Sequence, residues 1–167
     1  MTEEATSTTT AIPDKEAIRA ELEATKAGYH ELLGSLSAED WKKKSANSAW
    51  NVRQLMWHIT WGNSFTPQGV DQCRKGNNFN PPMAIVNPLN SLWTRIRSRS
   101  ATPESVGKMY DEVHEKILAC LNSVQDGEWQ KSAKSFGNEM TVESCFHEPK
   151  RHLDEHGADI RKGLGRG

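Results

Sequence analysis

The sequence predicts an all-α protein built as a four-helix bundle. Four long segments carry apolar residues at helical spacing on one side, and no segment alternates apolar and polar residues as a half-buried strand does. Helices with one apolar side bury that side most simply against one another, so four of them favour a bundle. We therefore expect a single domain over residues 13–164, with an insertion of loop and short helix between the second and third helices.

The first helix is predicted from Asp14 to about residue 36, because a proline and an acidic cap precede a regular apolar stripe. Its inward residues are Ile18, Leu22, Tyr29, Leu32 and Leu33. Residues 1–12, which precede it, lack the basic start and apolar core of a signal peptide. We expect them to form a disordered tail, and we expect the protein to be cytoplasmic.

The second helix is predicted from Asn51 to about Lys75, with an inward stripe of Val52, Leu55, Met56 and Ile59. Trp57 and Trp61 point away from that stripe, and large exposed aromatic side chains are unusual. We expect the insertion or a second subunit to cover them, and we favour a homodimer interface.

The insertion consists of a loop over residues 76–83 and a short helix over residues 87–99. Long irregular stretches beside a cavity tend to determine specificity. We expect this segment to form one wall of a substrate pocket, with Phe79 and Trp93 against the ligand. Arg95 and Arg99 share one helical face, which is either a solvated surface or a site for the carboxylate or phosphate of an anionic substrate.

The third helix is predicted to begin at Thr102, because threonine, proline and glutamate follow in the order typical of helix starts. Its stripe comprises Val106, Met109, Tyr110, Val113, Ile117 and Leu121. The fourth helix is predicted from Thr141 to about Leu164, with a stripe that includes Val142, Cys145, Phe146, Leu153 and Ile160. Pro149 lies inside this pattern, where a proline normally kinks or begins a helix.

Composition excludes several classes of partner. The net charge is −1 and the pI is about 6.6, whereas nucleic-acid and membrane-surface binders usually carry a basic excess. No stretch has the apolar length of a membrane span. We therefore expect a small-molecule substrate and no nucleic-acid or membrane partner. The cysteines, Cys73, Cys120 and Cys145, are odd in number and scattered, which argues against a disulfide framework and a thiolate metal site.

Three histidines are the candidate metal ligands. His152 and His156 are one turn apart on the inward side of the fourth helix, and His58 lies at the edge of the second helix's stripe. Neutral imidazoles about 6 Å apart along a helix axis can share a zinc-like ion. Three such ligands leave a coordination position open, which favours a reactive site over a structural one.

These residues carry a resemblance to the DinB-like family of DNA-damage-inducible four-helix-bundle proteins. The run W-N-V-R-Q-L-M-W-H over residues 50–58 resembles the start of that family's second helix, and H-L-D-E-H over residues 152–156 resembles the H-x-x-x-H of its fourth. The resemblance covers about residues 14–164 and implies the same fold, with His58, His152 and His156 as metal ligands. Members of the family include thiol-dependent transferases or isomerases, hydrolases, and tailoring enzymes that act on reactive metabolites.

Two carboxylates and a further histidine are candidates for proton chemistry. Glu148 and Asp159 lie on the histidine side of the fourth helix, about one turn either way. A carboxylate there can orient an imidazole or take a proton from metal-bound water. We assign Asp159 to orienting a ligand, and we treat Glu148 and His114 as the weaker catalytic candidates.

The residues and the resemblance together predict an enzyme that uses one divalent ion to act on a reactive small molecule or secondary metabolite. Zinc is the expected ion, with nickel, iron and manganese as alternatives. The ion would activate water for hydrolysis, or hold a low-molecular-weight thiol cosubstrate for a transferase or isomerase reaction. A second hypothesis, from another class, is a non-catalytic bundle that binds metal or a ligand in a stress response.

Overall fold

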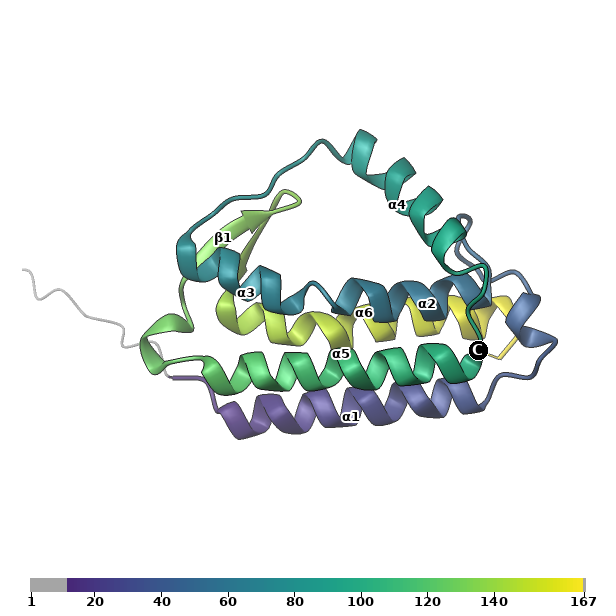
Figure 1. Ribbon diagram of the computed structural model, residues 1–167, viewed down its shortest axis with the longest axis horizontal. Coiled ribbons are helices and arrows are strands. Elements are labelled where there is room, and N and C mark those ends of the chain that lie inside the picture. The colour runs from purple at the N-terminus through teal and green to yellow at the C-terminus, as the bar shows by residue number, and fades with distance from the viewer. Residues whose placement is uncertain (1–11, 167) are drawn as a thin grey trace, which may run out of the picture.

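A computed structural model describes residues 12–166, and the helices within them confirm the predicted all-α four-helix bundle (Figure 1). A short hairpin and two single turns of 3-10 helix complete it. In chain order the elements are α1 (Lys15–Gly34), η1 (Asp40–Lys42), α2 (Val52–Asn63), α3 (Thr66–Lys75), α4 (Met83–Arg97), α5 (Pro103–Ser123), η2 (Asp126–Glu128), β1 (Ser132–Ser135), β2 (Asn138–Thr141) and α6 (Val142–Gly163).

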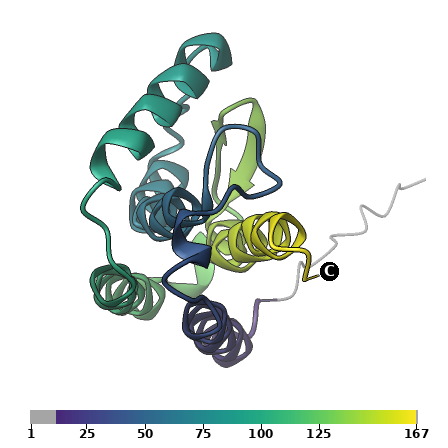
Figure 2. The ribbon, with the colours of Figure 1, turned by 90° about the vertical axis from the view of Figure 1, so that its right-hand side faces the viewer.

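Of the four helical positions in the bundle, three are filled by α1, α5 and α6. The fourth is filled by α2 and α3, which follow each other end to end (Figure 1). Both α1 and α2 pack against α5 and α6. Viewed from its end, the bundle therefore has α1 and α2 at opposite corners (Figure 2). This arrangement places α2 beside α6, and these two helices carry the candidate metal ligands.

Side-chain caps fix where the helices of the site begin. Asn51 caps α2: its Oδ1 accepts a hydrogen bond from the Gln54 N–H at 2.9 Å, and the Gln54 side chain accepts one from the Asn51 N–H. Thr141 and Ser144 cap α6 in the same reciprocal way. Such a cap contributes about 1 kcal/mol to stability and specifies the residue at which the helix begins.

The second predicted helix is interrupted, which corrects the expectation of one helix from Asn51 to Lys75. It ends at Asn63 and resumes at Thr66 as α3. Pro67 explains the interruption, because a proline inside a helix lacks the N–H and collides with the carbonyl four residues earlier. In the first turn of α3 the same proline is tolerated, since that N–H has no helical partner.

Pro149 neither begins nor ends a helix, because α6 runs without interruption from Val142 to Gly163. The proline is buried and removes the hydrogen bond that its N–H would have made to the Cys145 carbonyl. The histidine pair follows one turn later on continuous helix.

The connections differ most from the prediction. Within the insertion, α4 begins at Met83, earlier than the expected short helix, and contains Pro88. A hairpin that the sequence did not predict follows α5, with Ser132 of β1 paired antiparallel to Thr141 of β2. The two strands read Ser-Ala-Lys-Ser and Asn-Glu-Met-Thr, so they lack the apolar alternation by which strands are recognised.

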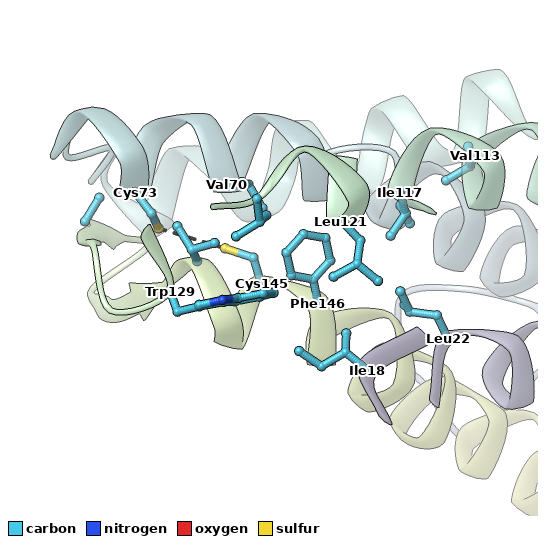
Figure 3. Packing of buried hydrophobic residues seen from close by; sticks show 13 residues of the cluster. Ile18, Leu22, Val70, Cys73, Val113, Ile117, Leu121, Trp129, Cys145 and Phe146 are labelled. Atoms are coloured by element: carbon cyan, nitrogen blue, oxygen red, sulfur yellow. Dashed lines mark hydrogen bonds between the residues drawn. The ribbon is translucent and has the colours of Figure 1, made fainter. Parts of the chain in front are cut away.

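Buried apolar side chains form two clusters along the bundle. The cluster nearer the hairpin contains Trp129 and Phe146, whose ring centroids lie 6.3 Å apart (Figure 3). The other contains Tyr29 and Tyr110, whose rings stack at 3.9 Å. The Tyr29 hydroxyl donates to the Met56 carbonyl at 3.1 Å, which ties α1 to α2 across the core.

Two of the three cysteines are neighbours, which corrects their expected scatter. Cys73 of α3 and Cys145 of α6 are both buried, with their Sγ atoms 3.9 Å apart (Figure 3). Burial raises the pKa of the Cys145 thiol. These two side chains therefore pack as small apolar groups within the first cluster.

Three further expectations concern the surface and the N-terminus. Of the predicted tail, residues 1–11 lie outside the described residues. No helix in residues 12–166 is long and apolar enough to span a membrane. Trp57 is only 8% exposed and stacks on the half-buried Trp61 at 5.6 Å, so the burial of Trp57 needs no second subunit. A homodimer at this face stays a prediction.

Candidate metal centre

Three histidines from two helices meet at one point of the bundle. His58 of α2 and His152 and His156 of α6 each offer one ring nitrogen, and these nitrogens lie within 4.8 Å of one another. The ring centroid of His58 lies 5.0 Å from that of His152 and 5.3 Å from that of His156. One ion can therefore reach all three rings after small side-chain rotations.

Both histidines of α6 are oriented by a hydrogen bond at Nδ1. Nδ1 of His152 donates to Oδ1 of Asn63 at 3.2 Å, and Nδ1 of His156 donates to Oδ2 of Asp159 at 3.2 Å. Metal-binding histidines commonly hold their other nitrogen in this way. The contacts do not involve Nε2 of either ring, and they place Asp159 beside the imidazole of a candidate ligand, His156.

The ring of His58 is positioned by α4 and by two tryptophans. Its Nδ1 lies 3.5 Å from the hydroxyl of the fully buried Thr94. Trp50 packs against the ring at a centroid distance of 4.3 Å and an interplanar angle of 33°, and Trp61 lies at 6.1 Å. The insertion therefore helps to orient a candidate ligand, although it supplies none itself.

Gly62 allows α2 and α6 to approach each other at the site. A Cβ atom at this position would lie 3.0 Å from Nδ1 of His152 and closer still to its Cε1. A residue without Cβ is therefore required for the ring to stay where it is. Because His152 comes from another helix, this requirement is visible only in three dimensions.

Burial keeps two of the candidate ligands neutral. It lowers the pKa of His58 to about 3, and the nearby His156 adds to that effect. Burial likewise lowers the pKa of His152 to about 2, with smaller contributions from His58 and His156. Neutral imidazole is the form that binds a metal ion, so these rings are in the ligating state at neutral pH.

The metal-free protein is expected to lose stability as the pH falls below 6.5, the ordinary histidine pKa. Between that pH and about 3, His58 and His152 become protonated in the unfolded chain but stay neutral in the folded chain. The free energy of unfolding should fall by at most about 1.4 kcal/mol per pH unit for each histidine, and this loss should be absent above the ordinary pKa.

Urea unfolding of the metal-free protein across this range measures the effect. The matched variant, His58→Gln with His152→Gln, should show a flatter dependence because glutamine does not titrate. Equal slopes in the two proteins would contradict the prediction.

A cavity of about 820 Å³ lies beside the histidines, a size typical of small-molecule sites. His58 and His152 line it on the bundle side, and most of the other lining residues come from α2, α3, α4, the hairpin and the loop that contains Phe79. The predicted wall residues Phe79 and Trp93 are both in its lining. A second groove, of about 610 Å³ between α1 and α6, contains none of the histidines.

The two predicted substrate-binding arginines lie outside the cavity lining. The Arg95 guanidinium donates to the Ala49 carbonyl at 3.1 Å. The backbone carbonyl of Arg99 accepts a hydrogen bond from Arg53 at 3.2 Å. The apolar side of α4 lines the cavity in their place, so the lining does not support an anionic substrate.

Neither predicted proton carrier reaches the cavity lining. Glu148 accepts a hydrogen bond from Arg151 at 3.0 Å on the outer side of α6. His114 is buried in α5, with Nε2 3.1 Å from Oε1 of Glu23. Among the described residues, the cavity lining contains no carboxylate.

Sequence reasoning missed Asn63 and Thr94, the partners of His152 and His58. Each is buried in the structure. In the sequence, the only signal is a polar residue that lies within a helical segment beside apolar or aromatic residues. The spacing of Asn63 from His58 does not relate it to His152. Both contacts depend on how α4 and α6 fold back against α2.

Comparisons with known proteins agree with this fold. The family model of the DinB superfamily matches residues 9–160. The structure is similar to YfiT from Bacillus subtilis, described as a probable metal-dependent hydrolase with an unusual four-helix bundle topology. The TM-score is 0.71 at 14% identity, with 96% of this chain and 93% of that one covered. No curated protein sequence matches the chain.

Two structures of the mycothiol-dependent maleylpyruvate isomerase, one of them a mutant, are also similar. Their TM-scores are 0.68 at 11% and 10% identity, and 89% of this chain is covered. The chain spans only 61% of the isomerase's length. At these identities the likeness establishes the fold.

Proposed function

The chain belongs to the DinB superfamily, and from this premise we propose that it is a metal-dependent enzyme acting on a small molecule. The observation that carries the proposal is the meeting of three histidines, two of which, His58 and His152, line an apolar cavity. Pockets of this kind, apolar with a few convergent polar groups, are the usual sites of small-molecule chemistry.

The residues present fit a divalent ion such as zinc. Three imidazole nitrogens are the donor set of many catalytic zinc sites, and His58, His152 and His156 supply them. Asn63 and Asp159 orient the rings of His152 and His156 by accepting hydrogen bonds from their Nδ1 atoms. When bound, such an ion lowers the pKa of a coordinated water or thiol and so supplies a nucleophile at neutral pH.

The composition of the cavity favours a thiol over water as that nucleophile. Hydrolysis usually draws on a general base, and no carboxylate among the described residues lines the cavity. A thiol, with a pKa of about 8.5, needs less help to ionise than water, with about 15.7. We therefore rank a thiol-dependent transferase or isomerase first, and one structural relative is named for its dependence on mycothiol.

Hydrolysis is the second candidate, because YfiT, which matches over nearly its whole length, is described as a probable metal-dependent hydrolase. The apolar lining would serve either reaction. It keeps water away from the reacting groups, which strengthens electrostatic interactions there. His58 and His152 would help to hold the ion where they line the cavity, and the other lining residues would be available to the substrate.

An activity screen tests the proposal. Tag-free protein is either loaded with zinc or stripped of metal with a chelator. Each preparation is assayed with activated esters and with α,β-unsaturated carbonyl compounds, in the presence and absence of a low-molecular-weight thiol. We expect turnover that requires both the metal and the thiol. Metal-dependent turnover of esters without thiol would instead assign a hydrolase. Metal binding without turnover in any arm would assign a non-catalytic metal-binding bundle.

A further inference from the structure

The cavity beside the histidines carries no formal charge apart from any charge on the histidines themselves. Among the described residues, its lining contains no lysine, arginine, aspartate or glutamate. Five of the lining side chains are aromatic besides the histidines: Trp61, Phe65, Phe79, Trp93 and Phe136. Burying an ionised group in such surroundings is costly unless a partner charge or hydrogen bonds compensate it. The lining therefore selects against a charged ligand.

The apolar side of α4 is turned toward this cavity. Val86, Leu89, Trp93 and Ile96 recur at helical spacing and all line it. Leu89, Trp93 and Ile96 are nonetheless about half exposed, at 60%, 46% and 45%. Side chains of this size rarely stay exposed as a group without a function, and here they surround a volume continuous with the histidines.

The end of the cavity formed by the hairpin is held in place by hydrogen bonds. The Phe79 N–H donates to the Lys134 carbonyl at 2.8 Å, and the Phe136 N–H donates to the Phe79 carbonyl at 3.0 Å. Asn78 and Asn80 add two more contacts, accepting from the Lys134 and Gly137 N–H groups. The rings of Phe79 and Phe136 meet edge to face at 5.4 Å. These contacts therefore hold Phe79 and Phe136 in a defined position in the cavity wall.

We infer that the substrate is a neutral, ring-bearing hydrophobic compound whose polar or reactive group lies at the histidines while its rings lie between α3, α4 and the hairpin. The inference rests on the proposed function for the role of the histidines. The ring preference follows from the aromatic lining, because flat rings stack and pack edge to face with other aromatic groups. The cavity volume suits a ligand of drug-like size.

Two fluorescent probes of similar shape test the charge preference on metal-free protein. N-phenylnaphthylamine is neutral, and anilinonaphthalenesulfonate carries one negative charge. Without metal, no bound ion can attract the sulfonate, so the comparison reports the cavity alone. The neutral probe should bind at least about tenfold more tightly, because the lining offers the sulfonate no cation.

A matched pair of substitutions on α4 locates the binding. Leu89 lines the cavity and is 60% exposed, whereas Ile85, one turn away and 57% exposed, does not line it. Leu89→Asp should weaken the neutral probe at least about tenfold, and Ile85→Asp should change its affinity by less than about twofold. Circular dichroism checks that both variants remain folded. Ile96→Asp is a second lining variant that should behave as Leu89→Asp does.

Three outcomes would overturn the inference. Equal affinity for the two probes would remove the charge preference, and equal weakening by Leu89→Asp and Ile85→Asp would place the probe elsewhere. Sedimentation of the wild type as a dimer that Leu89→Asp dissociates would assign the exposed side of α4 to a second copy of the chain. Failure of the proposed function is distinguishable, because it would appear as a lack of metal binding or turnover and would leave the probe results unchanged.

Discussion

Replacing His152 and His156 together by alanine is expected to abolish metal binding while leaving the bundle folded. Loss of a partner that only orients a ligand typically costs about 10–100-fold in metal affinity, and removing two of three donors should cost more. The rest of the α6 stripe, including Phe146 and Ile160, remains in the core clusters. Elemental analysis of tag-free protein measures the effect, and circular dichroism checks the helices.

His147→Ala is the matched control for this variant. His147 lies on the same helix, but its Nδ1 contacts Glu21 on the surface at 2.7 Å and it is not part of the histidine cluster. It should keep the metal content of the wild type. Equal metal content in the double variant and the wild type would show that the ion binds elsewhere.

Gly62→Ala is expected to weaken metal binding by about 10–100-fold without unfolding α2. The added Cβ occupies space that the His152 ring fills, so the ring must move away from the other two. Helix propensity acts in the opposite direction, because alanine favours an interior helical position over glycine by about 1 kcal/mol. A fall in metal affinity with little loss of stability would therefore identify a local effect at the site.

Isothermal titration with zinc and thermal unfolding of the metal-free protein separate the two effects. Gly34→Ala serves as the control, since a Cβ added there meets nothing within 4 Å. Unchanged zinc affinity in Gly62→Ala would mean that the ring can move without loss of coordination, and the proposed role of the glycine would be wrong.

Helical periodicity was sufficient to predict the bundle and the approximate position of each histidine. Val52, Leu55 and Ile59 are fully buried, and this stripe indicates where His58 lies, although α2 is also buried on the side of Trp57. The same reasoning places His152 and His156 on α6. These predictions succeed because burial of a stripe depends mainly on the residues within one helix.

Contacts between elements could not be predicted in this way. The roles of Asn63, Thr94 and Gly62 arise only when α4 and α6 pack against α2, and no local pattern encodes that approach. Arg95 and Arg99 lie outside the cavity lining for a related reason. The apolar side of α4 lines the cavity, so the charged side chains of this helix point elsewhere.

The diagonal placement of α1 and α2 also has a consequence for how the chain folds. Neither helix completes its packing with the other, since both depend on α5 and α6, which follow much later in the sequence. Pairings between distant segments form slowly, because a long loop must close before the contact is gained. His58 therefore meets its two partners only after α6 docks. A divalent ion bound by the three histidines would then stabilise the chain with α6 docked, by mass action.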